Sequence, residues 1–122
     1  MLSADSIAKA RRQAAAFTDN YRQSQALGYN VTTMGLPSYD TQEDFDSYRP
    51  EDAGSDYQKE NEFIAEILKG LFANGVPAKA VKIRYADYTK WLKGRENTSS
   101  NRASYCGMLI GEEERRIDRS RG

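Results

Sequence analysis

Near the N-terminus, apolar residues recur at three- and four-residue spacing, at Ile7, Ala10, Ala14, Phe17 and Tyr21. This is the period of one helix face, so we predict a helix from residue 4 to about residue 27. Ser3 is a suitable N-cap, and Gly28 suits the left-handed position after the last turn. The face is narrow and rich in alanine, which favours close packing against another helix.

A wider apolar stripe follows in the middle of the chain, at Phe63, Ile64, Ile67, Leu68, Leu71 and Phe72. It predicts a second amphipathic helix at the centre of the core. Ser55 and Gln58 have the spacing of a capping box at its start. Asn74-Gly75 predicts a left-handed cap at its end, with Val76 in apolar contact and Pro77 preventing continuation.

Between residues 81 and 93 the apolar period changes. Val81, Ile83 and Tyr85 alternate with basic residues, which predicts a short strand. The apolar residues that follow predict a short helix over residues 87–93, namely Tyr88, Trp91 and Leu92.

A last helix is expected from about residue 101. Its expected inward side chains are Ala103, Cys106, Leu109 and Ile110. Gly107 and Gly111 weaken this prediction, and a strand over residues 105–111 is the alternative. Residues 112–122 are highly charged and are expected to form a frayed tail.

Residues 29–55 show no sustained period and contain two glycines and two prolines. We therefore expect an irregular acidic connecting segment. Within it, residues 30–34 favour a short strand and residues 44–48 a helical turn. The fold class predicted for residues 1–122 is a single, mainly α domain. It has about three main helices and a short β element, with α+β as the alternative.

Composition removes most catalytic chemistry. The chain contains no histidine and one cysteine, Cys106. Histidine-dependent triads, cysteine–histidine pairs, histidine or multi-cysteine zinc sites and an intrachain disulfide are thereby excluded. No phosphate-loop pattern occurs among the glycines. We therefore expect a protein that is not an enzyme and uses no metal or cofactor.

The chain also lacks an apolar run long enough to span a membrane and an apolar core typical of a secretory signal. We expect a cytoplasmic protein that does not bind membranes. Its 18 basic and 18 acidic residues balance, so any electrostatic function must come from their uneven distribution along the chain.

The first uneven region is acidic and contains interleaved aromatic residues. A partner-binding surface is predicted there, made of Asp40, Glu43, Asp44, Phe45, Asp46, Tyr48, Glu51, Asp52 and Asp56. Such a surface fits a protein with a basic face, and aromatic residues are common interface anchors. A solvated, partly flexible loop is one alternative. A divalent cation site is another, but the spacing lacks the glycine and final glutamate of a calcium loop.

The second uneven region is basic. Its candidate nucleic-acid-binding residues are Lys82, Arg84, Lys90, Lys93, Arg95 and Arg102. Phosphate contacts from these cations, with stacking on nearby aromatic rings, would bind DNA or RNA. The alternative is that the aromatic residues form core and the cations are its solvated side. A helix-turn-helix is weakly indicated, since the second helix would be poor in base-reading side chains.

The predicted function is therefore non-enzymatic protein binding. One concrete version is an inhibitor encoded by a phage or plasmid, such as an anti-CRISPR protein. Its acidic segment would cover the basic channel of a nucleic-acid-binding defence complex. A small DNA- or RNA-binding regulator that uses residues 79–102 is the alternative. A third class is an assembly protein that self-associates through the alanine face of the first helix.

Overall fold

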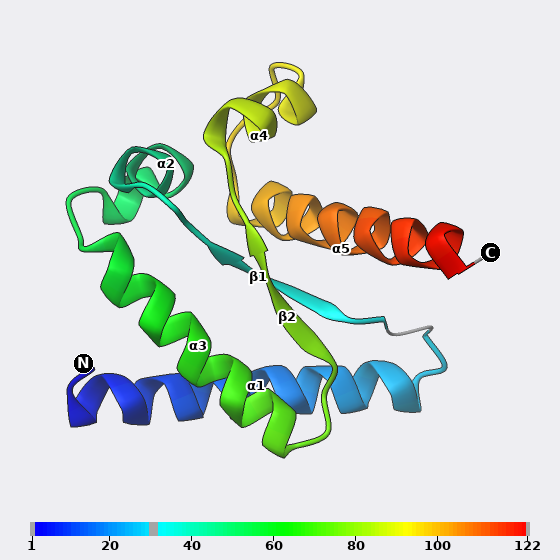
Figure 1. Ribbon diagram of the computed structural model, residues 1–122. Helices are drawn as coiled ribbons and strands as arrows, with labels where there is room; N and C mark the ends of the chain where they lie inside the picture. Colours follow the sequence, from blue (N-terminus) through cyan, green and yellow to red (C-terminus); the bar gives the residue numbers. More distant parts are fainter. Residues whose placement is uncertain (1, 30–31, 122) are drawn as a thin grey trace.

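A pair of parallel β-strands runs through the middle of the molecule in the computed structural model, which describes residues 2–29 and 32–121 (Figure 1). Met34 lies opposite Ala78, and Ser38 lies opposite Lys82. The element order is α1 (Ala4–Ala26), β1 (Met34–Ser38), α2 (Gln42–Tyr48), the 3₁₀ turn η1 (Pro50–Asp52), α3 (Tyr57–Ala73), β2 (Ala78–Lys82), α4 (Tyr85–Leu92) and α5 (Ser99–Arg121). Parallel strands need a long crossover connection, and α2, η1 and α3 provide it.

Helices cover both sides of the strand pair. Figure 1 shows α1 and α3 below the strands and α5 above them. One hydrophobic cluster joins α1 and α3 to Leu36 of β1. A second cluster joins Val81 of β2 to α2, α4 and α5. The two clusters share no residue, and the strand pair lies between them with Leu36 in one and Val81 in the other.

The alanine face of α1 packs closely against α3, as its composition predicts. Ala10 and Ala14 are buried together with Ile64, Ile67 and Leu71. A Cβ atom at Gly70 of α3 would lie only 2.6 Å from the Cβ of Ala14, so the crossing depends on small side chains.

A similar close approach brings α5 against β1. A Cβ atom at Gly35 would lie 2.8 Å from Ile110 Cγ1 and 3.0 Å from the carbonyl oxygen of Cys106. The second of these neighbours is backbone, which cannot move away as a flexible side chain can. Glycine at position 35 therefore sets how closely α5 approaches the sheet.

The predicted ends of the first two long helices are largely confirmed. Ser3 Oγ accepts a hydrogen bond from the Ser6 N–H at 3.1 Å and caps α1. The caps after α1 and α3 place Gly28 and Gly75 at φ of 85° and 74°. The predicted Ser55–Gln58 capping box is wrong, because Asp56 is the N-cap and accepts from the Gln58 N–H at 2.9 Å.

The segment 29–55 is more regular than predicted. It contains β1, α2 and η1, and α2 includes the predicted helical turn. The predicted strand at 30–34 includes residues 30 and 31, which lie outside the described residues. The observed strand starts at Met34. The sequence indicated these elements only in part, because each is too short to establish a period.

The C-terminal region also differs from the prediction. α5 begins at Ser99 and continues to Arg121, so residues 105–111 are helical rather than a strand, and the helix includes residues 112–121. Glu112 and Arg116 stand four residues apart, a spacing that stabilises helices. Glu113 also forms an ion pair with Lys79 of β2 at 3.1 Å.

Two predicted core residues lie on the surface. Phe72 is 87% exposed, because it follows Leu71 by about 100° around the helix and so lies on the side of α3 that the described residues leave uncovered. Ala103 is exposed as well, whereas Tyr105 of the same helix is buried.

The predicted fold class is confirmed: the chain is mainly helical and carries a short two-stranded element. Helices α1, α3 and α5 are the three long ones in the described chain. Within the same residues, no helix combines the length and the apolar character needed to cross a bilayer.

We predict that Gly35→Ala destabilises the protein by about 1–3 kcal/mol, because the added methyl group overpacks the β1–α5 contact. Gly107→Ala is the matched control, since a Cβ atom there meets no other atom within 4 Å. The control should be neutral or stabilising by up to about 1 kcal/mol, the gain expected when alanine replaces helical glycine. Urea unfolding compares the two, and equal midpoints for Gly35→Ala and wild type would reject the packing argument.

Candidate binding surface and groove

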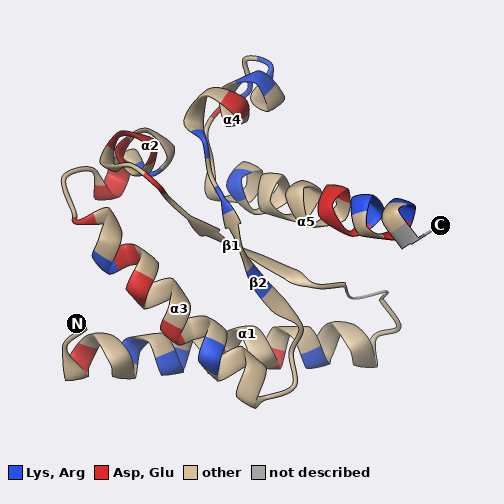
Figure 2. Ribbon diagram, viewed as in Figure 1, with Lys and Arg blue, Asp and Glu red and all other residues tan. Residues whose placement is uncertain are grey.

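The acidic residues of the predicted surface gather at one corner of the molecule, formed by α2, η1 and the start of α3 (Figure 2). Residues 40–62 contain nine acidic side chains and two basic ones. We call the carboxylates of residues 40–62 the acidic corner. Half of the 18 acidic residues of the chain belong to it, so a neutral protein carries a locally negative surface.

The two aromatic members of the predicted surface are core residues instead. Phe45 and Tyr48 are each 1% exposed. Tyr48 packs edge-on against Tyr88 at 4.7 Å between ring centroids, and its hydroxyl donates to the Arg102 carbonyl oxygen at 3.1 Å. They cannot anchor a partner, because α2 turns both rings inward.

Asp44 supports two helices. Its backbone N–H donates to Thr41 Oγ1 at 3.1 Å, and that hydroxyl donates to Asp44 Oδ2 at 3.0 Å, which closes the start of α2. Its other oxygen, Oδ1, accepts from the Tyr85 N–H at 3.0 Å. Arg84, the N-cap residue of α4, makes no side-chain capping bond. Asp44 therefore caps α4 from a distant part of the chain.

Asp46 also has a structural role. Its Oδ1 accepts from the Gly54 N–H at 2.9 Å and from the Gln42 side-chain amide at 2.8 Å. These hydrogen bonds favour the ionised form and lower the pKa of Asp46. They hold the loop after η1 against α2 without cancelling the charge of Asp46.

Two arginines lie among the carboxylates. Arg49 contacts Asp52 at 2.6 Å and Glu60 at 3.4 Å. Arg102 contacts Glu51 at 2.6 Å, with its side chain only 15% exposed. Arg102 is therefore largely buried beside the acidic corner, which removes it from the predicted nucleic-acid surface.

The remaining predicted acidic residues are the most accessible. Asp40 forms an exposed ion pair with Lys82 at 3.0 Å, a type of contact that contributes little to stability. Glu43 is exposed on the first turn of α2. Asp56 is exposed and caps α3, a role that asparagine can also fill.

The aromatic residues near the basic segment are mostly core. Tyr88 is fully buried and stacks with the partly buried Trp91. Arg95 lies 4.4 Å above the Trp91 ring, and its guanidinium donates to the Leu92 and Trp91 carbonyl oxygens at the end of α4. Arg95 therefore caps α4.

The other basic candidates remain on the surface. Arg84, Lys90 and Lys93 are exposed around α4, and Lys93 has a left-handed conformation with φ of 53°. Lys82 belongs to the ion pair with Asp40. The structure thus places aromatic core and solvated cations in the same stretch, with four of the six candidate cations, Arg95 included, exposed around α4.

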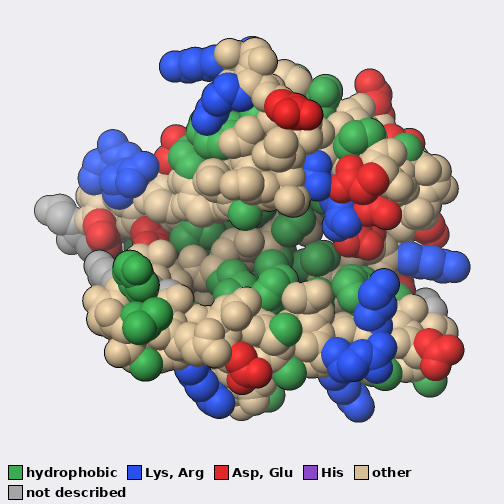
Figure 3. Space-filling view, turned by 180° about the vertical axis from the view of Figure 1, so that it is seen from behind, with side chains coloured by type: hydrophobic (Ala, Val, Ile, Leu, Met, Phe, Trp, Pro, Cys, Tyr) green, Lys and Arg blue, Asp and Glu red, His purple; other side chains and the backbone are tan. Residues whose placement is uncertain are grey.

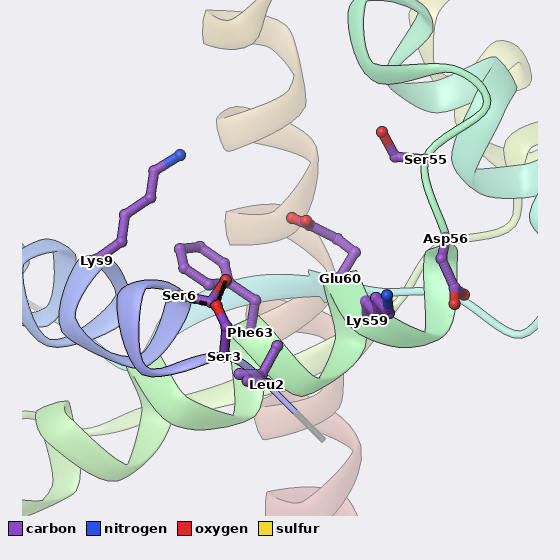
Figure 4. Close-up of a pocket in the computed structure, with 9 residues that line it drawn as sticks. All are labelled: Leu2, Ser3, Ser6, Lys9, Ser55, Asp56, Lys59, Glu60 and Phe63. Atoms are coloured by element: carbon purple, nitrogen blue, oxygen red, sulfur yellow. Dashed lines mark hydrogen bonds between the residues drawn. The ribbon is translucent and has the colours of Figure 1, made fainter.

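A hollow beside the acidic corner was not predicted. A cavity of about 420 Å³ lies between the first turns of α1 and α3 (Figure 4). It continues into a cavity of about 430 Å³, and the two share Lys9, Ser55, Glu60 and Phe63. A third cavity, of about 280 Å³, shares Leu36, Pro37 and Arg49 with the second. We call the second and third cavities the β1 groove.

Glu60 lies where the first two cavities meet. Burial raises the pKa of Glu60, although the nearby Arg49 guanidinium partly opposes the shift. Figure 4 shows its carboxylate extending from α3 toward the side of the cavity where Lys9 of α1 and Phe63 of α3 itself lie. The cavity therefore combines a desolvated carboxylate, a cation and an aromatic ring.

From behind, the molecule is hollowed between α1 and the helices above it, and hydrophobic side chains form the floor (Figure 3). Acidic and basic side chains gather at the end of the hollow near α2. Sequence reasoning missed this feature because α1, β1, α2, α3 and α5 each contribute only a few lining residues. No local motif marks such a groove.

Comparisons with known proteins found no relative. A scan against models of protein families matched none, and searches of curated proteins and of solved structures found no similar protein.

Asp44→Ala should destabilise the protein by roughly 1–2 kcal/mol, because it removes the acceptor of the Thr41 hydroxyl at the start of α2 and leaves the Tyr85 N–H at the start of α4 without its acceptor. Glu43→Ala, at the neighbouring exposed position, should change stability by less than about 0.5 kcal/mol. Chemical unfolding measures both, and equal effects of the two substitutions would contradict the dual capping role.

Asp46→Asn should change how stability depends on pH. The pKa of Asp46 is lower in the folded chain than its usual value of 3.8. Its ionised form therefore stabilises the fold above that value, and this stabilisation disappears as pH falls through the folded pKa. Urea midpoints should differ between variant and wild type near pH 7 and converge near pH 2. A difference independent of pH would mean that the charge of Asp46 has no role.

Proposed function

We propose that the protein is a non-enzymatic binding protein whose acidic corner docks against a basic surface of another protein. The observation that carries the proposal is the concentration of nine carboxylates within residues 40–62, on a corner built from defined helices. Complementary charge steers association and suppresses wrong partners.

The hydrogen bonds inside the acidic corner support this function. Asp44 and Asp46 bind backbone N–H groups, which order the corner without adding a positive charge to it. The corner also gains order from the Thr41 and Asp56 caps. A surface that is ordered before binding loses less conformational entropy on association than a flexible loop does.

The groove beside the acidic corner adds shape to the charge. Phe63, Leu36 and Pro37 supply apolar lining, while Lys9 and the ion-paired Arg49, Asp52 and Glu60 supply charged groups of both signs. Interfaces that combine an apolar centre with a charged rim are typical of specific protein association. A narrower version of the proposal is an inhibitor, carried by a phage or plasmid, that covers the basic nucleic-acid channel of a defence complex.

Three substitutions test the acidic corner: Asp40→Asn, Glu43→Gln and Asp56→Asn, the last chosen because asparagine can still cap α3. Asp44 and Asp46 are excluded, because their side chains cap helices and hold a loop. The control removes three acidic charges from α5, through Glu112→Gln, Glu114→Gln and Asp118→Asn. Each protein is immobilised and incubated with nuclease-treated lysate of the cells that encode it.

The expected result is one protein that wild type and control retain stoichiometrically and that the corner variant loses. Its association rate with the variant should fall by roughly tenfold at low salt, with a smaller loss at high salt. Retention by all three proteins would reject the acidic corner. Binding to oligonucleotides, falling steeply with salt, would instead support the alternative of a DNA- or RNA-binding regulator that uses Arg84, Lys90 and Lys93.

A further inference from the structure

The outer edge of β2 is unpaired. The sheet formed by the described residues has two strands, so each strand has one free edge. The Met34 N–H donates to the Pro77 carbonyl oxygen, and the Ile83 N–H donates to the Ser38 carbonyl oxygen, both at 2.9 Å. In a parallel pair, alternate residues direct both backbone groups to the same side. On β2, residues 77, 79, 81 and 83 therefore face β1, whereas Ala78, Ala80 and Lys82 face outward.

The two free edges of the sheet differ. On β1, Pro37 faces outward and has no N–H to donate. At the next outward position, the Asn61 side chain accepts from the Tyr39 N–H at 3.0 Å and donates to the Tyr39 carbonyl oxygen at 2.7 Å. Proline and a covering group both protect a strand edge from further pairing. On β2 each outward residue has an N–H group, and within the described chain none of the outward backbone groups forms a hydrogen bond.

The two lysines of β2 are drawn away from its outer edge. A lysine on an edge strand commonly prevents another chain from pairing there. Here Lys79 forms an ion pair with Glu113 of α5 at 3.1 Å, and Lys82 forms one with Asp40, which follows β1, at 3.0 Å. Ala80, between the two lysines, is exposed. In Figure 1 no helix lies across β2, so the edge is accessible at its centre.

The outward groups of β2 are complementary to those of an identical strand. An antiparallel copy centred on Ala80 places Ala80 opposite Ala80, and Ala78 opposite Lys82. Each of these opposed pairs exchanges two hydrogen bonds, so every outward donor and acceptor of both copies has a partner. No lysine stands directly opposite another lysine. A two-fold axis relates the two strands, which is the symmetry of most protein dimers.

Helix α5 adds matching charges beside this edge. A cavity of about 190 Å³ lies along β2 and α5, and its charged lining residues are Lys82, Glu112, Glu113 and Arg116. Their charges sum to zero, so two identical surfaces do not repel each other. Glu112 and Arg116 are exposed, and neither belongs to an ion pair of the described residues. Opposite charges four residues apart on a helix can pair reciprocally with the same two residues across a two-fold axis.

We propose that the protein forms a two-fold dimer in which β2 pairs antiparallel with β2 of a second copy. The result is a continuous sheet of four strands, with both copies of α5 on the same face. A sheet of two strands is only marginally stable by itself, and additional strands stabilise it. The dimer goes beyond the partner-binding function proposed above, because the acidic corner is formed by other elements.

The test places charges at the two-fold axis of the full chain, through Ala80→Lys and Ala80→Glu. Either substitution sets like charges directly opposite each other and should abolish association. An equimolar mixture sets lysine opposite glutamate and should restore it. Sedimentation equilibrium measures the mass from micromolar to millimolar concentration. The matched controls are Ala16→Lys and Ala16→Glu, at an exposed position of α1, and each should associate as wild type does.

Amide hydrogen exchange of the ¹⁵N-labelled wild type gives a second readout that needs no substitution. Between dilute and concentrated samples, exchange at Ala80 should slow by roughly tenfold, because pairing protects its outward N–H. Exchange at Val81, whose N–H faces β1, should change much less.

The dimer is rejected if wild type has the mass of one chain at every concentration. It is also rejected if both Ala80 variants associate when alone, or if their mixture stays monomeric while each variant keeps the urea midpoint of wild type. Slow exchange at Ala80 in dilute wild type would show that the edge is already covered within one chain, and would reject the dimer as well.

Discussion

The close contact between β1 and α5 at Gly35 is the constraint on which much of the structure depends. Two parallel strands alone have little stability, since sheets of this kind are normally buried on both faces. Here α3 covers one face and α5 the other. α5 can come close enough only because position 35 carries no side chain. The same absence of a side chain leaves room next to Pro37, where the β1 groove opens.

The charged residues show a second principle, in which one carboxylate serves structure and surface together. Asp44 and Asp46 accept hydrogen bonds from backbone N–H groups that would otherwise have no acceptor at a helix start and in a turn. Satisfying an amide does not neutralise the carboxylate, so the corner remains negative. Arg49 and Arg102 compensate part of this charge from within. The chain has zero net charge, yet its acidic and basic side chains lie in separate regions of the surface.

Sequence periodicity predicted the elements that are long and one-sided. The stripe from Phe63 to Leu71 specified α3, and the alanine face specified α1 together with its tight packing. α2 was harder to recognise, because Phe45 and Tyr48 are its two buried residues among acidic neighbours. Their aromatic character was correctly noticed but read as an interface. A ring beside carboxylates looks the same in sequence whether the helix turns it inward or outward.

The groove and the distant caps lay beyond sequence reasoning for a different reason. Asp44 and Tyr85, or Asn61 and Tyr39, meet only after the chain has folded, and no spacing rule connects them. Gly107 was read as evidence against a helix, yet it lies on the exposed side of α5, where a missing side chain removes no contact. The low helix propensity of glycine was outweighed in α5 by the free energy gained from burying Tyr105, Cys106 and Ile110.

The parallel register also has a consequence for how the protein is made. Met34 pairs with Ala78 and Ser38 with Lys82, so β1 has no strand partner until the ribosome has completed α2, η1 and α3. Contacts between residues far apart in sequence close slowly, because the intervening chain must first lose entropy. During synthesis α1 and α3 can already associate, whereas both edges of β1 await a partner. The nascent chain therefore passes through a stage in which this strand is exposed to chaperones or to other copies of itself.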